Sequence, residues 1–196
     1  MAYDADVARR KAMTPTKWRT DIVDRLAEDI RSRGAEMVLD LGCGTGQLAK
    51  HLADQGFDVT AIDLSPRNVE ATRSRGVSAD VADFASLPFP DNSFDASFAM
   101  NSLLHVPPEE LSGVLFEISR VLVRGATLLI VVWGGSTRQG FIDDEWLDPP
   151  RYFSTYTDDD LVALETPGFR HGNFRAVDIA EDGHDLHLQI LTLEAI

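Results

Sequence analysis

A short stretch around residue 40 combines residue types that can bind a nucleotide-like ligand. The apolar run Val38-Leu39-Asp40-Leu41 carries one acid, and Gly42, Gly44 and Gly46 follow it at every second position. The run predicts a buried parallel strand. The glycines allow a sharp turn and leave no side chain between the backbone and a ligand. Because residues 47–53 predict a helix whose first N–H groups face the same crevice, the stretch predicts a binding corner at the carboxyl end of a sheet.

A second acid, Asp63, ends the strand predicted over residues 58–62 and follows Asp40 by 23 positions. An acid at this distance can accept both hydrogen bonds of a ribose diol; a strand-end cap is its alternative role. Nicotinamide dehydrogenases share such an acid, but their fingerprint requires glycine at the first, third and sixth positions. Counted from Gly42, the sixth position is Gln47, which is too large for that close helix–strand contact. An NAD-dependent dehydrogenase is therefore the weaker alternative.

Two other side chains have reactivity of their own. His105 follows the strand predicted over residues 94–98, and it can act as a general base because its pKa lies near neutral pH. A structural histidine bonded to loop backbone is the alternative. Cys43 lies between two glycines, which suggests a nucleophile, but a buried free cysteine usually acts as a small hydrophobic residue.

The elements that position these residues alternate between strand and helix, as in doubly wound α/β folds. The five strands of this part are predicted over residues 38–41, 58–62, 77–79, 94–98 and 127–132. Three helix starts are predicted where proline follows a capping residue or another proline, at Thr14-Pro15, Ser65-Pro66 and Pro107-Pro108.

The last third of the chain departs from this alternation. Residues 134–156 are rich in Gly, Asp, Pro and aromatic residues, so we expect an irregular connection. Thr157 and the three acids that follow it predict a short helix. Strands are predicted over residues 174–179 and 186–193, and no helix fits between them. They should therefore pair antiparallel.

The chain has 196 residues, one cysteine and a net charge of −14. We expect residues 1–196 to form one domain, with residues 1–33 as an N-terminal helical segment. Residues 1–75 hold 12 basic and 12 acidic side chains, and residues 76–196 hold 6 basic and 20 acidic ones. Phosphate-backbone binding needs clustered Lys and Arg, so a nucleic-acid partner is disfavoured. The acidic half favours a neutral or cationic small molecule, or serves solubility alone. One cysteine and the lack of a signal-type or membrane-spanning apolar run predict a cytoplasmic protein with no membrane partner.

Four motifs follow one another in order. They are Asp40-Leu41-Gly42-Cys43-Gly44-Thr45-Gly46, then Val59-Thr60-Ala61-Ile62-Asp63-Leu64-Ser65, then Asp83-Phe84 ahead of Leu87-Pro88-Phe89-Pro90-Asp91-Asn92-Ser93-Phe94-Asp95, and finally Asn101-Ser102-Leu103-Leu104-His105-Val106. This set resembles the class I S-adenosylmethionine-dependent methyltransferases over residues 36–196. The family usually has Lys-Pro-Gly-Gly where this chain has Val123-Arg124-Gly125, a departure that affects only a turn.

The resemblance implies a Rossmann-like, doubly wound α/β fold with a seven-stranded sheet. The implied strand order is 3-2-1-4-5-7-6, with strand 7 antiparallel and helices on both faces. The implied cofactor is S-adenosylmethionine, with S-adenosylhomocysteine as the product. The residues that the resemblance places at the cofactor are Asp40, Gly42, Cys43, Gly44, Gly46, Asp63, Leu64, Asp83, Phe84, Met100 and Asn101. Asp40 and the glycine loop would hold the amino-acid end, and Met100 and Asn101 would lie beside the methionine portion. Asp83 would bind the adenine amino group and Phe84 would lie near the ring, with Asp80 as the competitor of Asp83.

In resembling enzymes the region after strand five covers the acceptor pocket, which points here to residues 134–156. Trp146, Tyr152 and Phe153 would line that pocket, and the acids Asp143 to Glu145 would attract an amine. A solvated loop with ordinary anchoring aromatics is the alternative. Tyr3 and Trp18 are candidates for a lid over the cofactor, although helix packing is the favoured role of Trp18.

These features together predict transfer of a sulfonium methyl group to an O, N or C nucleophile of a small molecule. The reaction would be an in-line displacement that needs alignment and exclusion of water, with His105 as the candidate base and no metal. A monomer or homodimer is expected. The alternative is an inactive regulatory module that binds S-adenosylmethionine or S-adenosylhomocysteine. No motif identifies the acceptor.

Overall fold

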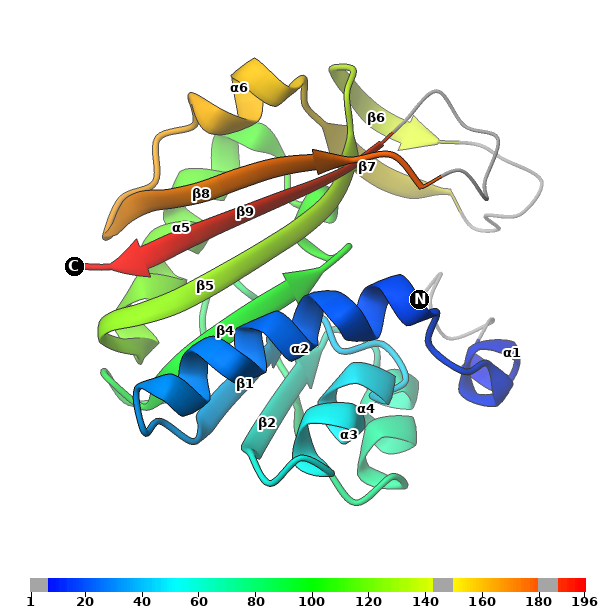
Figure 1. Ribbon diagram of the computed structural model, residues 1–196. Helices are drawn as coiled ribbons and strands as arrows, with labels where there is room; N and C mark the ends of the chain where they lie inside the picture. The colour runs from blue at the N-terminus through cyan, green and yellow to red at the C-terminus, as the bar shows by residue number, and fades with distance from the viewer. Residues whose placement is uncertain (1–6, 143–149, 180–186) are drawn as a thin grey trace.

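The computed structural model describes residues 7–142, 150–179 and 187–196. Seven strands form one sheet in the order β3-β2-β1-β4-β5-β9-β8 (Figure 1). They are β1 (Met37–Leu41), β2 (Asp58–Asp63), β3 (Ser78–Val81), β4 (Phe94–Met100), β5 (Leu122–Gly134), β8 (Phe169–Val177) and β9 (His187–Ala195). β9 runs antiparallel to both β5 and β8, whereas β1 to β5 pair with one another in parallel. The predicted order, with the seventh strand of the sheet antiparallel, is therefore confirmed.

Helices cover both faces of this sheet, as predicted. Their bounds are α1 (Val7–Ala12), α2 (Lys17–Ser32), α3 (Gln47–Ala53), α4 (Pro66–Arg73), α5 (Pro108–Val121) and α6 (Asp158–Val162), with a 3₁₀ turn η1 at Leu103–His105. One apolar core contains buried residues of α2, α3 and α4, and the other contains those of α5 and α6. No helix among the described residues is long and apolar enough to cross a membrane.

Alternation along β1 and β5 supplies both cores. Leu39 and Leu41 pack into the core with α5, while Val38 packs into the core with α2 and α3. Successive side chains of a strand point to opposite faces, so a strand covered on both sides needs apolar residues at consecutive positions. This is why the central part of β5 is a continuous apolar run and β1 is apolar apart from Asp40.

The expectation of an irregular segment over residues 134–156 is wrong. β6 (Arg138–Ile142) and β7 (Arg151–Thr155) form an antiparallel pair in which Phe141 lies opposite Tyr152. Their rings meet edge to face at a centroid distance of 5.8 Å, a cross-strand contact of the kind that stabilises a two-stranded sheet. The Gly and Pro content of the segment hides this pairing.

The predicted start of the second helix is also wrong. α2 begins at Lys17 after the N-cap Thr16, not at Thr14-Pro15, and the Thr16 side chain makes no capping bond. The Gln47 side chain donates hydrogen bonds to the carbonyls of Arg10 and Met13. This tertiary contact holds the chain before Thr14 against α3, and it overrides the local signal.

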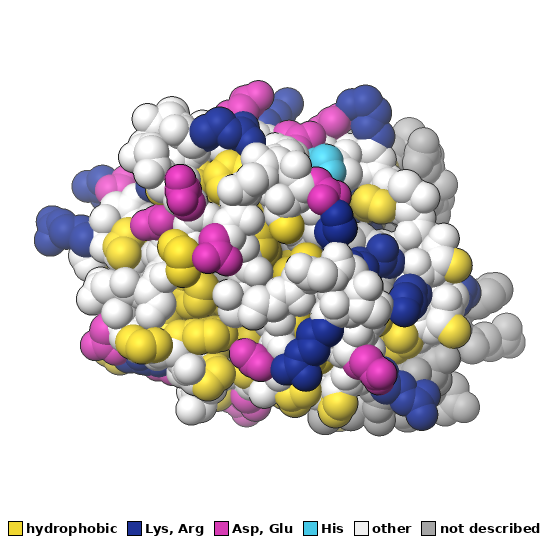
Figure 2. Space-filling view, turned by 90° about the horizontal axis from the view of Figure 1, so that it is seen from below, with side chains coloured by type: hydrophobic (Ala, Val, Ile, Leu, Met, Phe, Trp, Pro, Cys, Tyr) yellow, Lys and Arg dark blue, Asp and Glu magenta, His cyan; other side chains and the backbone are white. Residues whose placement is uncertain are grey.

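Basic side chains are unevenly spread over one face of the molecule. Figure 2 shows this face from below, with most of its Lys and Arg side chains on the right half and others at the left edge and the top. α1 lies on that side in Figure 1 and carries Arg9, Arg10 and Lys11. The basic residues of the N-terminal part therefore flank the carboxyl ends of the central strands.

Candidate functional site

The glycine loop after β1 is glycine-rich for two different reasons. Gly42, Gly44 and Gly46 all have left-handed φ values, of 78°, 54° and 73°. A Cβ on Gly42 would lie 2.4 Å from the Cβ of Ser102, and one on Gly46 would lie 2.6 Å from the Thr72 side chain. A Cβ on Gly44 would meet no described atom within 4 Å. The outer glycines thus allow internal packing, and the middle one leaves open space at the loop.

The amide N–H groups of this loop are already used inside the protein. Those of Gly42 and Cys43 both donate to the carbonyl of Ile62 at 2.9 Å, and that of Gly44 donates to Oδ2 of Asp63 at 2.9 Å. A dinucleotide site presents such N–H groups to a pyrophosphate. Here they face β2 instead, next to two carboxylates. The loop therefore disfavours an anionic ligand, which argues against the dehydrogenase alternative.

Asp40 is a buried acid without a hydrogen-bond partner among the described residues. Only 2% of its surface is exposed. Burial raises its pKa well above the usual value, and the charge of Asp63 adds to the effect. A buried carboxylate is costly unless a cation or hydrogen-bond donors satisfy it. Asp40 is therefore suited to a ligand that brings a positive charge.

Asp63 has a structural role as well as a place at the site. Its Oδ1 accepts from the Ser65 amide at 2.8 Å and from the Asn68 side chain at 3.2 Å, in addition to the Gly44 contact at Oδ2. Burial raises its pKa, although these hydrogen bonds oppose the shift. A carboxylate has about four acceptor positions, so Asp63 keeps capacity for one further donor. The cap and ligand roles considered for it are compatible.

Beyond β2, exposed apolar and acidic side chains adjoin the corner. Leu64 and Val81 are 48% and 51% exposed although both are hydrophobic, and Val81 is paired in register with Asp63. Asp80 forms an ion pair with Arg73 at 2.9 Å. Asp83 receives one hydrogen bond, from the Ala85 amide to Oδ1 at 3.0 Å, and Phe84 packs near Gly42. This arrangement leaves Asp83 more available to a ligand than Asp80.

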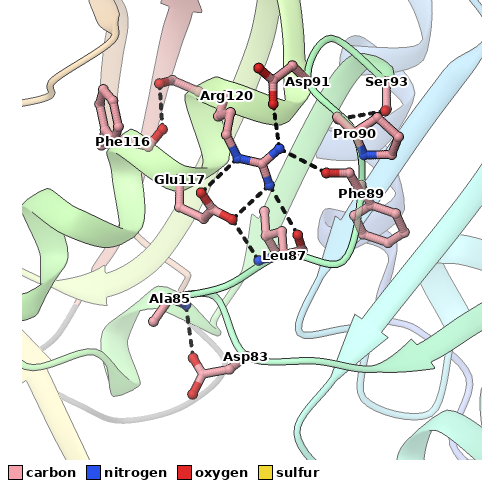
Figure 3. A network of polar contacts seen from close by, with 11 residues as sticks. Asp83, Ala85, Leu87, Phe89, Pro90, Asp91, Ser93, Phe116, Glu117 and Arg120 are labelled. Carbon is pink, nitrogen blue, oxygen red and sulfur yellow. Dashed lines mark hydrogen bonds and ion pairs between the residues drawn. The ribbon is translucent and has the colours of Figure 1, made fainter.

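The loop that carries Asp83 and Phe84 is held by Arg120 of α5 (Figure 3). Arg120 donates to both carboxylate oxygens of Glu117 at 2.8 and 2.9 Å and to Asp91 at 2.7 Å. It also donates to the carbonyls of Phe89 and Leu87 at 2.9 and 3.1 Å. Glu117 in turn accepts from the Leu87 amide at 2.8 Å. One side chain thus fixes a loop without regular structure.

The end of β4 closes the corner on its other side. Asn101 has φ 55°, a left-handed value for a residue with a side chain, and its buried Oδ1 has no hydrogen-bond partner among the described residues. Its amide donates to the carbonyl of Val131 at 2.8 Å, so pairing with β5 holds the strained backbone. Strain and an unsatisfied acceptor at one residue are typical of functional positions. Met100 precedes it and is partly exposed.

His105 contacts two of the residues predicted for the acceptor pocket. Its Nδ1 lies 2.8 Å from the carbonyl oxygen of Tyr152, and its ring meets Phe153 edge to face at 4.7 Å. Because a carbonyl only accepts, Nδ1 carries the proton of the neutral ring. Burial lowers the pKa of His105 to about 4, and the charges of Arg151 and Arg10 contribute. His105 is therefore neutral at pH 7. The predicted contacts Tyr3, Asp143, Asp144, Glu145 and Trp146 lie outside the described residues.

Cys43 and Trp18 have structural surroundings. Burial raises the pKa of the Cys43 thiol far above its usual value, so the thiol stays protonated, and its Sγ lies 3.4 Å from the Thr72 hydroxyl. Trp18 packs edge to face on Trp133 of β5, with centroids 6.2 Å apart. Among the described residues no group of three or more His, Cys, Asp or Glu side chains can hold a metal ion.

Two residues that shape the corner, Ser102 and Thr72, were not predicted as site residues. Ser102 donates from its hydroxyl to the carbonyl of Leu41 at 2.6 Å and lies under Gly42. Thr72 donates to the carbonyl of Gly44 at 3.2 Å and lies under Gly46. Serine and threonine are common throughout the chain, so only the fold distinguishes these two.

Comparison with known proteins agrees with this geometry. Residues 39–130 match the family model described as "Methyltransferase domain". This range contains both buried acids, the glycine loop and Asn101. The matched range and the fold support a class I S-adenosylmethionine-dependent methyltransferase. The same comparisons support S-adenosylmethionine as the cofactor.

Individual relatives and solved structures cover different parts of this chain. The 27-O-demethylrifamycin SV methyltransferase of Amycolatopsis mediterranei is 37% identical over 120 residues, which are 57% of this chain and 43% of that protein. The chain thus spans less than half the length of this relative. A methyltransferase structure from Methanosarcina mazei superimposes with a TM-score of 0.73 at 23% identity, over 83% of this chain and 93% of that one. The [4+2]-cyclase SpnF superimposes with a TM-score of 0.72 at 25% identity, over 94% and 84%.

The described residues fit this cofactor. A sulfonium and an ammonium give it two positive charges, and the corner has two buried carboxylates and no amide donors directed outward from Gly42, Cys43 and Gly44. Opposite charges within a few ångströms favour each other strongly where water is excluded.

Proposed function

We propose that this methyltransferase transfers a methyl group from S-adenosylmethionine to an O, N or C nucleophile of a small molecule. The observation that carries the proposal is Asp40, a buried carboxylate without a described hydrogen-bond partner beside an open Gly44. Its burial favours a ligand with a cationic group, and the ammonium of the cofactor's amino-acid end supplies one.

We assign the remaining contacts from the same corner. Asp63 has one acceptor position left for a ribose hydroxyl. Leu64 and Val81 offer exposed apolar surface for the adenine ring, with Asp83 as the acceptor for its amino group and Phe84 beside it. The Oδ1 of Asn101 is an acceptor for the methionine portion.

When bound, the cofactor supplies an activated methyl group, so the chain's own residues mainly have to align the nucleophile and exclude water. The β6–β7 pair and η1 bring Tyr152, Phe153 and His105 together at the strand ends. Since His105 is neutral with its proton on Nδ1, its Nε2 is the nitrogen that accepts a hydrogen bond. A pKa of about 4 makes it a weak base. His105 therefore orients an acceptor hydroxyl or amine more than it stores the proton.

The first experiment is a thermal-shift comparison of S-adenosylhomocysteine with NAD. A ligand at a hundred times its dissociation constant stabilises the folded state by about 2.7 kcal/mol, so S-adenosylhomocysteine should raise the melting temperature and NAD should not. No shift with S-adenosylhomocysteine refutes the proposal. The second experiment is a screen for S-adenosylhomocysteine release across small amines, phenols and carboxylates.

A second candidate is a protein of this fold that binds the cofactor without transferring its methyl group. The likeness to a [4+2]-cyclase over 94% of the chain supports keeping this candidate. A thermal shift with S-adenosylhomocysteine, together with a broad screen that releases none of it from S-adenosylmethionine, favours this candidate over the enzyme.

A further inference from the structure

A cavity of about 430 Å³ lies away from the cofactor corner, between α2 and the sheet. Ile22 and Leu26 of α2 form one wall, and Leu129 of β5 and Ile190 of β9 form part of the opposite wall. Figure 1 shows why space remains there: α2 crosses in front of β1 and β4, and no described helix covers the front of β9 and β8. The cavity has the size of a small-molecule site.

The two acids that line this cavity are already neutralised. Asp29 accepts from Arg33 at 2.6 Å and from the Thr127 hydroxyl at 3.0 Å. Glu194 accepts from Arg170 at 2.6 Å. Neither carboxylate therefore adds an uncompensated negative charge to the cavity.

The two arginines that line it are in the opposite situation. Arg25 of α2 and Arg175 of β8 both border the cavity. Among the described residues, no hydrogen bond or ion pair engages either guanidinium, although the chain carries a net charge of −14. Asp21 and Glu28 lie near Arg25 along the helix, but neither lines the cavity, and Asp21 pairs with Lys17 at 2.7 Å. In this acidic protein, the cavity is thus bordered by two cations that have no described partner and lie beside apolar walls.

We propose that this cavity binds a small amphipathic carboxylate. The apolar body would lie against Ile22, Leu26, Leu129 and Ile190, and Arg25 and Arg175 would bind the carboxylate, for which the guanidinium is the best matched side chain. The concave shape and the size favour a small molecule over the flatter surface of a second copy of the chain. The proposal is independent of the methyl-transfer reaction, because none of the lining residues belongs to the cofactor corner.

Isothermal titration of the whole protein with decanoate tests the proposal, with decanol as the uncharged probe of equal chain length. Decanoate should bind with one site per chain and at least tenfold more tightly than decanol. The double variant Arg25→Gln/Arg175→Gln should weaken decanoate binding at least tenfold. Lys50→Gln, which removes an exposed cation on α3 that pairs with Asp54, should leave it unchanged.

Two tryptophan variants on β8 test whether decanoate binds in this cavity or on other apolar surface. Asn173→Trp places a large ring at the cavity, and Ala176→Trp places the same ring at an exposed position on the same strand that does not line it. The first should abolish decanoate binding and the second should not. Each variant must still bind S-adenosylhomocysteine, or, if that ligand does not bind the wild type, melt at the wild-type temperature, to establish that it is folded. Equal binding of decanoate and decanol, equal binding by the double variant, or no decanoate binding by the wild type overturns the proposal.

Discussion

The guanidinium of Arg120 connects α5 to the loop between β3 and β4, so its removal tests how that loop is held (Figure 3). Arg120→Ala removes the bonds to Glu117, to Asp91 and to two backbone carbonyls. A hydrogen bond to a charged group contributes about 1.5–3 kcal/mol net. The contact with Asp91 contributes only about 0–1 kcal/mol, since that side chain is 69% exposed. Arg120 itself is 28% exposed, so we take about 1.5 kcal/mol for the Glu117 contact and about 1.5 kcal/mol for the two carbonyl contacts together, and expect a loss of about 3 kcal/mol.

Urea unfolding measures this loss as a lower midpoint at an unchanged m-value. Arg120→Lys keeps the charge without the forked geometry, and it should lose about half as much. Arg170→Ala is the matched control, because its ion pair with Glu194 is exposed on both sides and should contribute little to stability. Since the same loop carries Asp83, Arg120→Ala should also weaken S-adenosylhomocysteine binding, by about tenfold. A loss of stability no larger than that of Arg170→Ala refutes the reasoning.

Four other predictions follow from the corner itself. Asp40 has a raised pKa, so the ligand-free protein should lose stability as pH rises from below 4 through that raised pKa. In urea titrations at several pH values, Asp40→Asn should show a weaker pH dependence of stability than the wild type. The same variant should bind S-adenosylhomocysteine more weakly. Asn101→Gly should raise the free energy of unfolding by about 1 kcal/mol, because it relieves left-handed strain, and it should weaken S-adenosylhomocysteine binding. An unchanged affinity would show that the Asn101 side chain does not contact the ligand. Gly46→Ala should lower the free energy of unfolding by about 2–4 kcal/mol, because backbone strain adds to a clash with a buried side chain. Gly44→Ala should lower it by only about 1 kcal/mol of strain and should mainly block ligand binding. Equal melting temperatures of the two variants would contradict this. His105→Ala should lower turnover without changing cofactor affinity, and the wild-type pH–rate profile should show no histidine limb between pH 5 and 8, since the pKa of His105 is about 4.

Most of the fold that could be predicted from the sequence follows from patterns among neighbouring residues. β1, β2 and the central part of β5 are apolar runs that end at glycine or an acid, and these patterns depend only on neighbouring residues. The β6–β7 pair could not be predicted in this way, because its pairing joins segments separated by residues 143–150. The start of α2 likewise depends on the Gln47 side chain, which is distant in sequence.

The site was predictable to a similar extent. Asp40 and Asp63 were found because strand ends meet at one edge of a parallel sheet. The use of the loop amides by Ile62 and Asp63 was not predictable, although it argues against an anionic ligand. The pKa of His105 also depends on tertiary structure, because burial and the charges of Arg151 and Arg10 lower it.

The position of β9 has a consequence for biosynthesis. β9 lies between β5 and β8 in the sheet, yet it follows both in sequence. Until it emerges from the ribosome, one edge of β5 from Thr127 to Gly134 has no partner, and this edge is strongly apolar. Exposed apolar strand edges promote association between chains. A nascent chain of this protein is therefore most prone to aggregation after β5 is made, and insertion of Leu188, Ile190 and Leu191 between its two neighbours ends that period.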